Sequence, residues 1–130
     1  MLLLTIRTDK PDAEIGLFRD GAKLAYSTWQ AHRRLAETIH LKIQEVLESQ
    51  NYNLADIEGI AAFKGPGSFT GLRIGLSVAN TLAYTCDVPI VSTAGKDWVE
   101  LGVAKLQGGQ NDHIALPEYG SPPHTTLPRK

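Results

Sequence analysis

A glycine-rich segment, GPGSFTG at residues 65–71, lies between an apolar run and a helix-like run. A turn that leads into a helix can bind phosphate, because the free N–H groups of the first helical turn and the helix dipole both favour an anion. The segment lacks the Gly-Lys-Ser/Thr ending of a P-loop, and Pro66 removes one N–H donor. A tight turn is the favoured interpretation. Anion binding stays open as a second option, with these candidate residues: Gly65, Gly67, Ser68, Thr70 and Gly71.

Ser68 is the residue of this segment that could act as a nucleophile. A nucleophile elbow reads Gly-x-Ser-x-Gly, whereas Ser68 directly follows a glycine and Gly71 comes one residue too late. No His–carboxylate pair is signalled as its base. Ser68 or Thr70 fits better as a helix N-cap, because a hydroxyl there accepts a hydrogen bond from a free N–H group. We therefore predict no catalytic residue, and keep an ATP-binding or peptidase-like enzyme using the turn at 65–71 as the alternative.

The cysteine and the histidines show no spacing that is typical of a metal site. The single Cys86 excludes a cage of several cysteines within this chain, and its apolar surroundings favour a small packed side chain. None of the four histidines forms an H-x-x-x-H or H-E-x-x-H pair; they are His32, His40, His113 and His124. No metal ligand is predicted, and no cofactor is expected on this chain alone.

The composition predicts one soluble domain. The chain has 130 residues, of which 42% are hydrophobic, and a formal net charge of −1. This balance does not favour sequence-independent nucleic-acid binding, which depends on dense Lys and Arg. The apolar start, MLLLTI, is too short for a signal peptide or a membrane span. We expect a cytoplasmic protein without membrane contact.

The spacing of apolar residues follows two periods, that of a strand and that of a helix, and predicts the strands and helices that hold the glycine-rich turn in place. Alternating apolar residues and the hairpin signal Asp20-Gly21 predict a three-stranded antiparallel meander over residues 2–29. Helical and apolar runs then predict, in order, a helix at 32–51, a strand at 57–64, a helix at 70–86, a strand at 88–93 and a helix at 96–107. The order β-β-β-α-β-α-β-α indicates an α/β fold with a mixed sheet and parallel crossovers.

The helix predicted at 70–86 is apolar on nearly all sides. Such a helix is buried on most of its surface, so one side is expected to face the sheet and the other a second helix or another chain. Gly71 and Gly75 lie on one face and would allow another helix to approach closely.

The end of the chain has a different composition. From Gly108 onwards it is rich in proline, with Pro117, Pro122, Pro123 and Pro128. Proline cannot continue a helix or a central strand. We therefore divide the chain into a domain at 1–107 and an extended tail at 108–130, ordered only if it lies along the domain surface.

The segment at residues 57–95, IEGIAAFKGPGSFTGLRIGLSVANTLAYTCDVPIVSTAG, resembles the signature region of the TsaB (YeaZ) family of tRNA threonylcarbamoyladenosine biosynthesis proteins. The preceding helix is similar in spacing, and LPEYGSPPHTTLPRK resembles the closing segment of the family. The resemblance covers residues 1 to about 105 and the final segment.

This resemblance implies an actin/Hsp70-like (ASKHA, RNase H-like) lobe. It also implies a non-catalytic accessory subunit that binds a TsaD-like catalytic subunit for threonylcarbamoyl modification of adenosine 37 in tRNA. A TsaE-like ATPase and, through the complex, tRNA are the further partners implied. ATP and a metal are expected in the partner complex. A homodimer through the two helices at 32–51 and 70–86 is a further possibility.

The sequence departs from the family pattern in two places. A second lobe usually precedes the proline-rich end, and it is missing here, so we expect a single-lobe form. Arg7 stands where nucleotide-binding relatives have an acidic residue near the phosphates. Because a guanidinium cannot hold Mg²⁺, this weakens an ATPase or kinase function.

The resemblance places the partner interface on the two helices. The sequence does not divide their residues between sheet and partner. The candidates are Leu35, Ile39, Ile43 and Val46 on the first helix and Leu72, Arg73, Leu76, Ala79, Asn80 and Ala83 on the second. From these we expect Leu76→Glu or Ala79→Arg to abolish partner binding.

Overall fold

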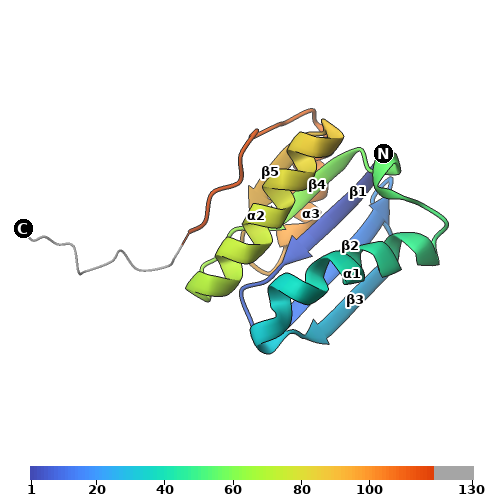
Figure 1. Ribbon diagram of the computed structural model, residues 1–130. Coiled ribbons are helices and arrows are strands. Elements are labelled where there is room, and N and C mark those ends of the chain that lie inside the picture. Colours follow the sequence, from blue (N-terminus) through green and yellow to red (C-terminus); the bar gives the residue numbers. More distant parts are fainter. Residues whose placement is uncertain (119–130) are drawn as a thin grey trace, which may run out of the picture.

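One mixed sheet organises the protein (Figure 1). The computed structural model describes residues 1–118, except for the side chain of His32. The strands lie in the order β3-β2-β1-β4-β5. Their bounds are Leu2–Arg7 (β1), Asp12–Arg19 (β2), Ala22–Gln30 (β3), Gly59–Phe63 (β4) and Ile90–Thr93 (β5).

The antiparallel meander and the parallel crossovers are both confirmed. β1 pairs antiparallel with β2 and parallel with β4, and β4 pairs parallel with β5. β2 and β3 are joined at Asp20-Gly21, where both residues have positive φ, 51° and 84°. Two consecutive positive φ values match the right-handed twist of a tight hairpin, which is why an Asp-Gly pair predicts it.

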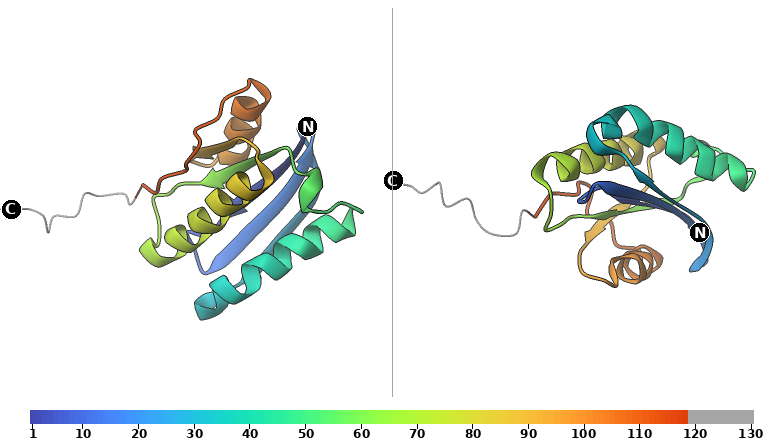
Figure 2. Two further views of the ribbon diagram at one scale, coloured as in Figure 1. Left: turned by 45° about the horizontal axis from the view of Figure 1, so that its top comes forward. Right: turned by 90° about the horizontal axis from the view of Figure 1, so that it is seen from below.

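Within residues 1–118, two helices cover one face of the sheet and one covers the other (Figure 2). They are α1 (Leu35–Ser49), α2 (Phe69–Cys86) and α3 (Trp98–Gln107), with short 3-10 turns at His32–Arg34 and Leu54–Asp56. Figure 2 shows α1 and α2 side by side over one face and α3 on the other face. The element order is the predicted one, and the α/β fold class is confirmed.

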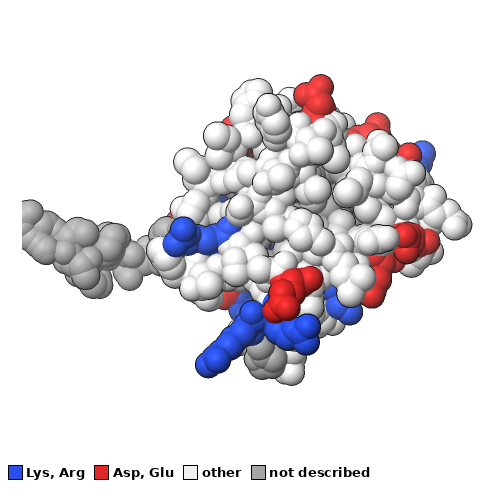
Figure 3. Space-filling view, in the orientation of Figure 1, with Lys and Arg blue, Asp and Glu red and all other residues white. Residues whose placement is uncertain are grey.

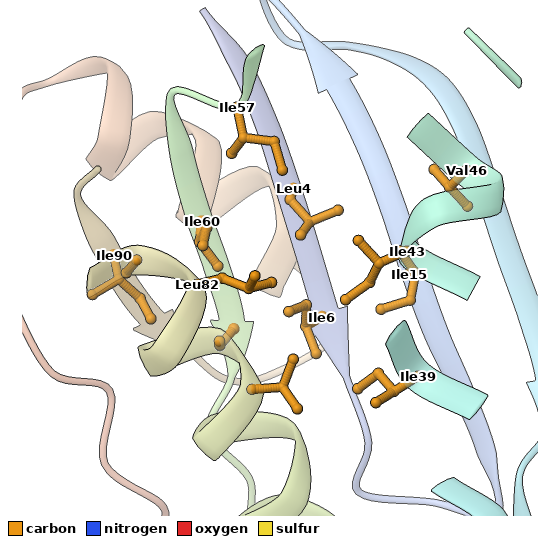
Figure 4. Close-up of a cluster of buried hydrophobic side chains, with 14 of the residues drawn as sticks. Leu4, Ile6, Ile15, Ile39, Ile43, Val46, Ile57, Ile60, Leu82 and Ile90 are labelled. Atoms are coloured by element: carbon orange, nitrogen blue, oxygen red, sulfur yellow. The ribbon is translucent and has the colours of Figure 1, made fainter. Parts of the chain in front are cut away.

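The main core lies between the sheet and the pair α1–α2 (Figure 4). Ile39 and Ile43 of α1 and Leu82 of α2 point towards Leu4 and Ile6 of β1. Residues of β1 alternate between the two faces, and Leu3 belongs to the smaller core under α3. Because both faces of β1 are covered, its near-continuous apolar run is explained.

The first part of the predicted tail lies along the domain. After α3 the chain turns at Gly108 and Gly109 and runs beside β5, past Asn80 of α2, to Lys64. Residues 119–130 lie outside the described residues, so the path expected for that part stays a prediction. Within residues 1–118, no helix is both long and apolar enough to cross a membrane.

Candidate partner-binding face

The glycine-rich turn packs tightly against the end of β1. Ser68 is the N-cap of α2: its Oγ accepts a hydrogen bond from the Gly71 N–H at 3.4 Å, and its own N–H donates to the Asp9 carbonyl at 3.0 Å. Thr8 donates its hydroxyl to the Gly71 carbonyl at 2.7 Å. The N-cap expected at Ser68 is confirmed, and two N–H groups of the turn are used within the chain.

The glycines of α2 make room for a different neighbour from the partner helix that was predicted. A Cβ on Gly71 would lie 2.1 Å from the Thr8 carbonyl oxygen, and a Cβ on Gly75 would lie 2.0 Å from Thr8 Oγ1. Both glycines therefore admit Thr8 of the same chain, and the expectation that they admit another helix was wrong. Sequence spacing alone does not show which neighbour a glycine face meets.

Arg7 forms an internal ion pair at the carboxyl end of β1. Its Nε donates to Asp9 Oδ1 at 2.7 Å, a second guanidinium nitrogen donates to Oδ2 at 3.2 Å, and its Cζ lies 4.0 Å from the centre of the Phe63 ring. The hydrogen bond to Asp9 raises the pKa of Arg7 above its ordinary value. The Asp9 carboxylate is therefore already paired with a positive charge from the same chain.

Glu14, which lies opposite Arg7 in the register of β1 and β2, also has partners within the chain. Tyr26 donates its hydroxyl to Glu14, and Lys10 Nζ lies 3.2 Å from the same carboxylate. Burial and the bond to Glu14 both raise the pKa of Tyr26. Within residues 1–118 there is no group of three or more His, Cys, Asp or Glu side chains that could hold a metal ion. The residues at this end of the sheet therefore do not fit a divalent cation.

We predict that Arg7→Ala lowers the free energy of unfolding by about 1–3 kcal/mol, because it leaves the Asp9 carboxylate without its guanidinium. Asp9 is 8% exposed, so water replaces the lost bonds poorly. Urea denaturation measures the loss, with Arg73→Ala as an exposed control. The double variant Arg7→Ala/Asp9→Ala should lose less than the sum of its single changes. Additive losses would contradict a coupled pair.

The structure buries most of the residues suggested for the interface. The following side chains are at most 6% exposed and contact the core: Leu35, Ile39, Ile43, Val46, Leu72, Leu76, Ala79 and Ala83. Arg73 is exposed, and Asn80 is half-buried, with its side chain bonded to Ala115. Leu76→Glu or Ala79→Arg would thus place a charge inside the core and test folding rather than binding.

Of the predicted interface residues, only Arg73 belongs to the exposed surface of α1 and α2, which otherwise consists of residues that were not predicted. The exposed stripe of α2 runs through Arg73, Ser77, Thr81 and Tyr84, spaced by three or four positions, and Tyr84 is 89% exposed. On α1, Ala36 and His40 are exposed towards α2. The signal that could have found these residues is the helical phase opposite Leu72, Leu76 and Ala79.

Two hollows follow the seam between the helices. One of about 470 Å³ is lined by Ala36, His40, Arg73, Ile74 and Ser77, among others. The second, also of about 470 Å³, continues from His40 to Leu47, Tyr52, Leu54 and Leu82. In Figure 3 charged side chains lie mainly towards the edges of this face, around a wide uncharged centre.

A family model described as TsaD: tRNA N6-adenosine threonylcarbamoyltransferase matches residues 29–94, about half of the chain, including both helices of this face and the glycine-rich turn. The chain belongs to the TsaD/TsaB (YeaZ) family. It is 32% identical over 99 residues to the tRNA threonylcarbamoyladenosine biosynthesis protein TsaB of Escherichia coli, with 72% of this chain and 40% of that protein covered. It is 43% identical over 97 residues to the tRNA N6-adenosine threonylcarbamoyltransferase of Clostridioides difficile, with 75% and 26% covered.

Structures of the TsaB (YeaZ) group share the fold. The chain superposes on YeaZ from Pseudomonas aeruginosa with a TM-score of 0.69 and 24% identity, over 82% of this chain and 50% of that one. The resemblance to TsaB (YeaZ) inferred from the GPGSFTG region is confirmed. The chain spans half or less of the length of these family members.

Proposed function

We propose that the chain is a non-catalytic accessory subunit that binds a TsaD-like catalytic subunit through the outer face of α1 and α2. In this function it supports threonylcarbamoyl modification of adenosine 37 in tRNA. The names of its relatives, a biosynthesis protein and a transferase of this modification, support the reaction class.

The composition of α2 is the observation that carries the proposal. Over its 18 residues Arg73 is the only charged one, although Ser77, Thr81, Tyr84 and Thr85 are exposed. Exposed helices of monomers usually carry many charges, whereas the centres of interfaces are depleted of them and enriched in aromatic residues and arginine. The adjoining hollows would accept apolar side chains of a partner helix.

The non-catalytic part of the proposal is supported by the carboxyl end of β1. There Arg7 pairs with Asp9, and Glu14 is bonded to Tyr26 and Lys10. The ATP and metal of the reaction would then bind in the catalytic subunit. A TsaE-like ATPase and tRNA would join through the complex, and a second copy of the chain could occupy the same helical face when the catalytic subunit is absent.

Co-purification tests this proposal. The chain is mixed with the tRNA N6-adenosine threonylcarbamoyltransferase encoded in the same genome, and size-exclusion chromatography with light scattering gives the mass of the complex. We expect a complex of one copy of each, and modified tRNA only when both subunits are present. Separate elution at micromolar concentrations would overturn the proposal.

The enzyme alternative is tested on the isolated chain. The turn at residues 65–71 leads into the N-terminus of an 18-residue helix, which is the observation that keeps nucleotide binding open. Isothermal titration with Mg-ATP should give no heat of binding if the chain is only an accessory subunit. Micromolar affinity for Mg-ATP would favour the enzyme.

A further inference from the structure

The outer edge of β5 is the part of the sheet most exposed to unwanted pairing. β5 is the last strand in the order β3-β2-β1-β4-β5, so one side of its backbone has no strand beside it within the described residues. Its surroundings, VPIVSTAG at residues 88–95, carry no charge. Uncharged edge strands pair readily with other chains, whereas the opposite edge strand β3 carries Lys23, a charge that discourages such pairing.

Residues 111–118, here called the strap, occupy this edge with side chains in place of a strand. The Ile90 N–H donates to Asn111 Oδ1 at 3.1 Å, and the Ser92 N–H donates to Asp112 Oδ2 at 3.1 Å. The Asp112 N–H donates to the Ile90 carbonyl at 2.8 Å. Two outward N–H groups and one carbonyl of β5 are thus satisfied within the chain.

The strap is fastened at two further points. The Asn80 side chain of α2 makes two hydrogen bonds with the Ala115 backbone, 3.0 and 2.7 Å long, and the Ala115 side chain is buried. The Glu118 N–H donates to the Lys64 carbonyl at 2.7 Å. A Cβ on Gly65 would lie 2.2 Å from the Glu118 carbonyl oxygen, so this glycine leaves room for the strap.

We propose that the strap is a strand substitute that prevents β5 from adding a strand of a second copy of this chain. The chain itself holds the hydrogen-bonding groups of the strap beside β5. The effective concentration of these groups therefore exceeds the concentration of a second copy in solution. When the strap is detached, the free N–H groups of Ile90 and Ser92 become a template for intermolecular pairing. This surface is separate from the α1–α2 face of the proposed function.

The test uses the full chain carrying Ala36→Glu, a change chosen to disfavour the association through α1 and α2 on which the proposed function rests. Asn111→Ala/Asp112→Ala removes both side-chain acceptors. Amide hydrogen exchange should show Ile90 and Ser92 protected before the change, and about tenfold faster exchange after it. Light scattering should show a monomer before the change and concentration-dependent oligomers after it.

Three results would overturn the proposal. Rapid exchange of Ile90 and Ser92 before the change would mean that the strap does not bind the edge. Unchanged exchange after it would mean that the two side chains are not the acceptors. Faster exchange with a strictly monomeric protein would mean that the strap does not control association.

A second pair of variants tests the other end of the strap, with Gly65→Ala expected to detach it and Gly95→Ala as the control. Gly65→Ala and Gly95→Ala both place a side chain at positive φ, 114° and 88°, but the Cβ meets the strap only at Gly65, whereas nothing lies within 4 Å at Gly95. Oligomers should form with Gly65→Ala and not with Gly95→Ala, while the circular dichroism of both stays that of the parent. Equal behaviour of the two folded variants would contradict the proposal.

Discussion

Ala36→Glu should lower the affinity of the chain for its TsaD-like subunit by about 100-fold. Ala36 is exposed at the start of α1 and lines the hollow between α1 and α2. A carboxylate there would be desolvated at the centre of the proposed interface without a designed partner. The chain should still fold, because glutamate is favourable in the first turn of a helix. Titration calorimetry with the purified subunit measures the affinity.

Ala104→Glu is the matched control for this variant. Ala104 is also an exposed helical alanine, but it lies on α3, on the opposite face of the sheet. The Ala104→Glu chain should bind the partner with the same affinity as the parent chain. An equal loss for both variants would show a non-specific effect of charge, and an unchanged affinity for Ala36→Glu would exclude the α1–α2 seam as the interface.

Gly75→Val should lower the free energy of unfolding by about 3 kcal/mol. Its Cβ would lie 2.0 Å from Thr8 Oγ1 and 2.9 Å from Thr8 Cβ, in a buried contact where α2 crosses the end of β1. Helix propensity alone predicts the opposite sign, since valine is a better helix former than glycine. Urea denaturation, monitored by circular dichroism, shows whether the free energy of unfolding falls or rises.

Two companion variants make this result specific. Ser77→Val adds a similar side chain at an exposed position of the same helix, so its effect should stay within about 0.5 kcal/mol. Thr8→Ala removes the hydroxyl that a new side chain at position 75 would meet, and it should recover part of the loss when combined with Gly75→Val. A Gly75→Val chain as stable as the parent would contradict the close approach.

The sequence predicts the element order well because its periodicities are clear. Alternation in residues 2–29 and the Asp20-Gly21 pair define the meander, and α1 has one apolar stripe. These signals are local, and the structure has the predicted order throughout.

The outer face of α2 was predicted less well. The prediction assigned Leu76 and Ala79 to the partner face, whereas the structure buries both and exposes the polar residues Ser77 and Thr81 of the same helix. The neighbours of Gly71 and Gly75 and the pairing of Arg7 with Asp9 depend on how the turn at 65–71 meets β1. Such contacts are tertiary, and no spacing in the sequence encodes them.

The strap has a consequence for the timing of synthesis. β5 ends at Thr93, and Asp112, which caps it, is made 19 residues later. At translation rates of about 5–20 residues per second, about 1–4 s of synthesis separate the end of β5 from its cap. The edge of β5 can therefore be closed only after the strand itself has been made. Slow codons between positions 93 and 112 would lengthen this interval without changing the finished protein.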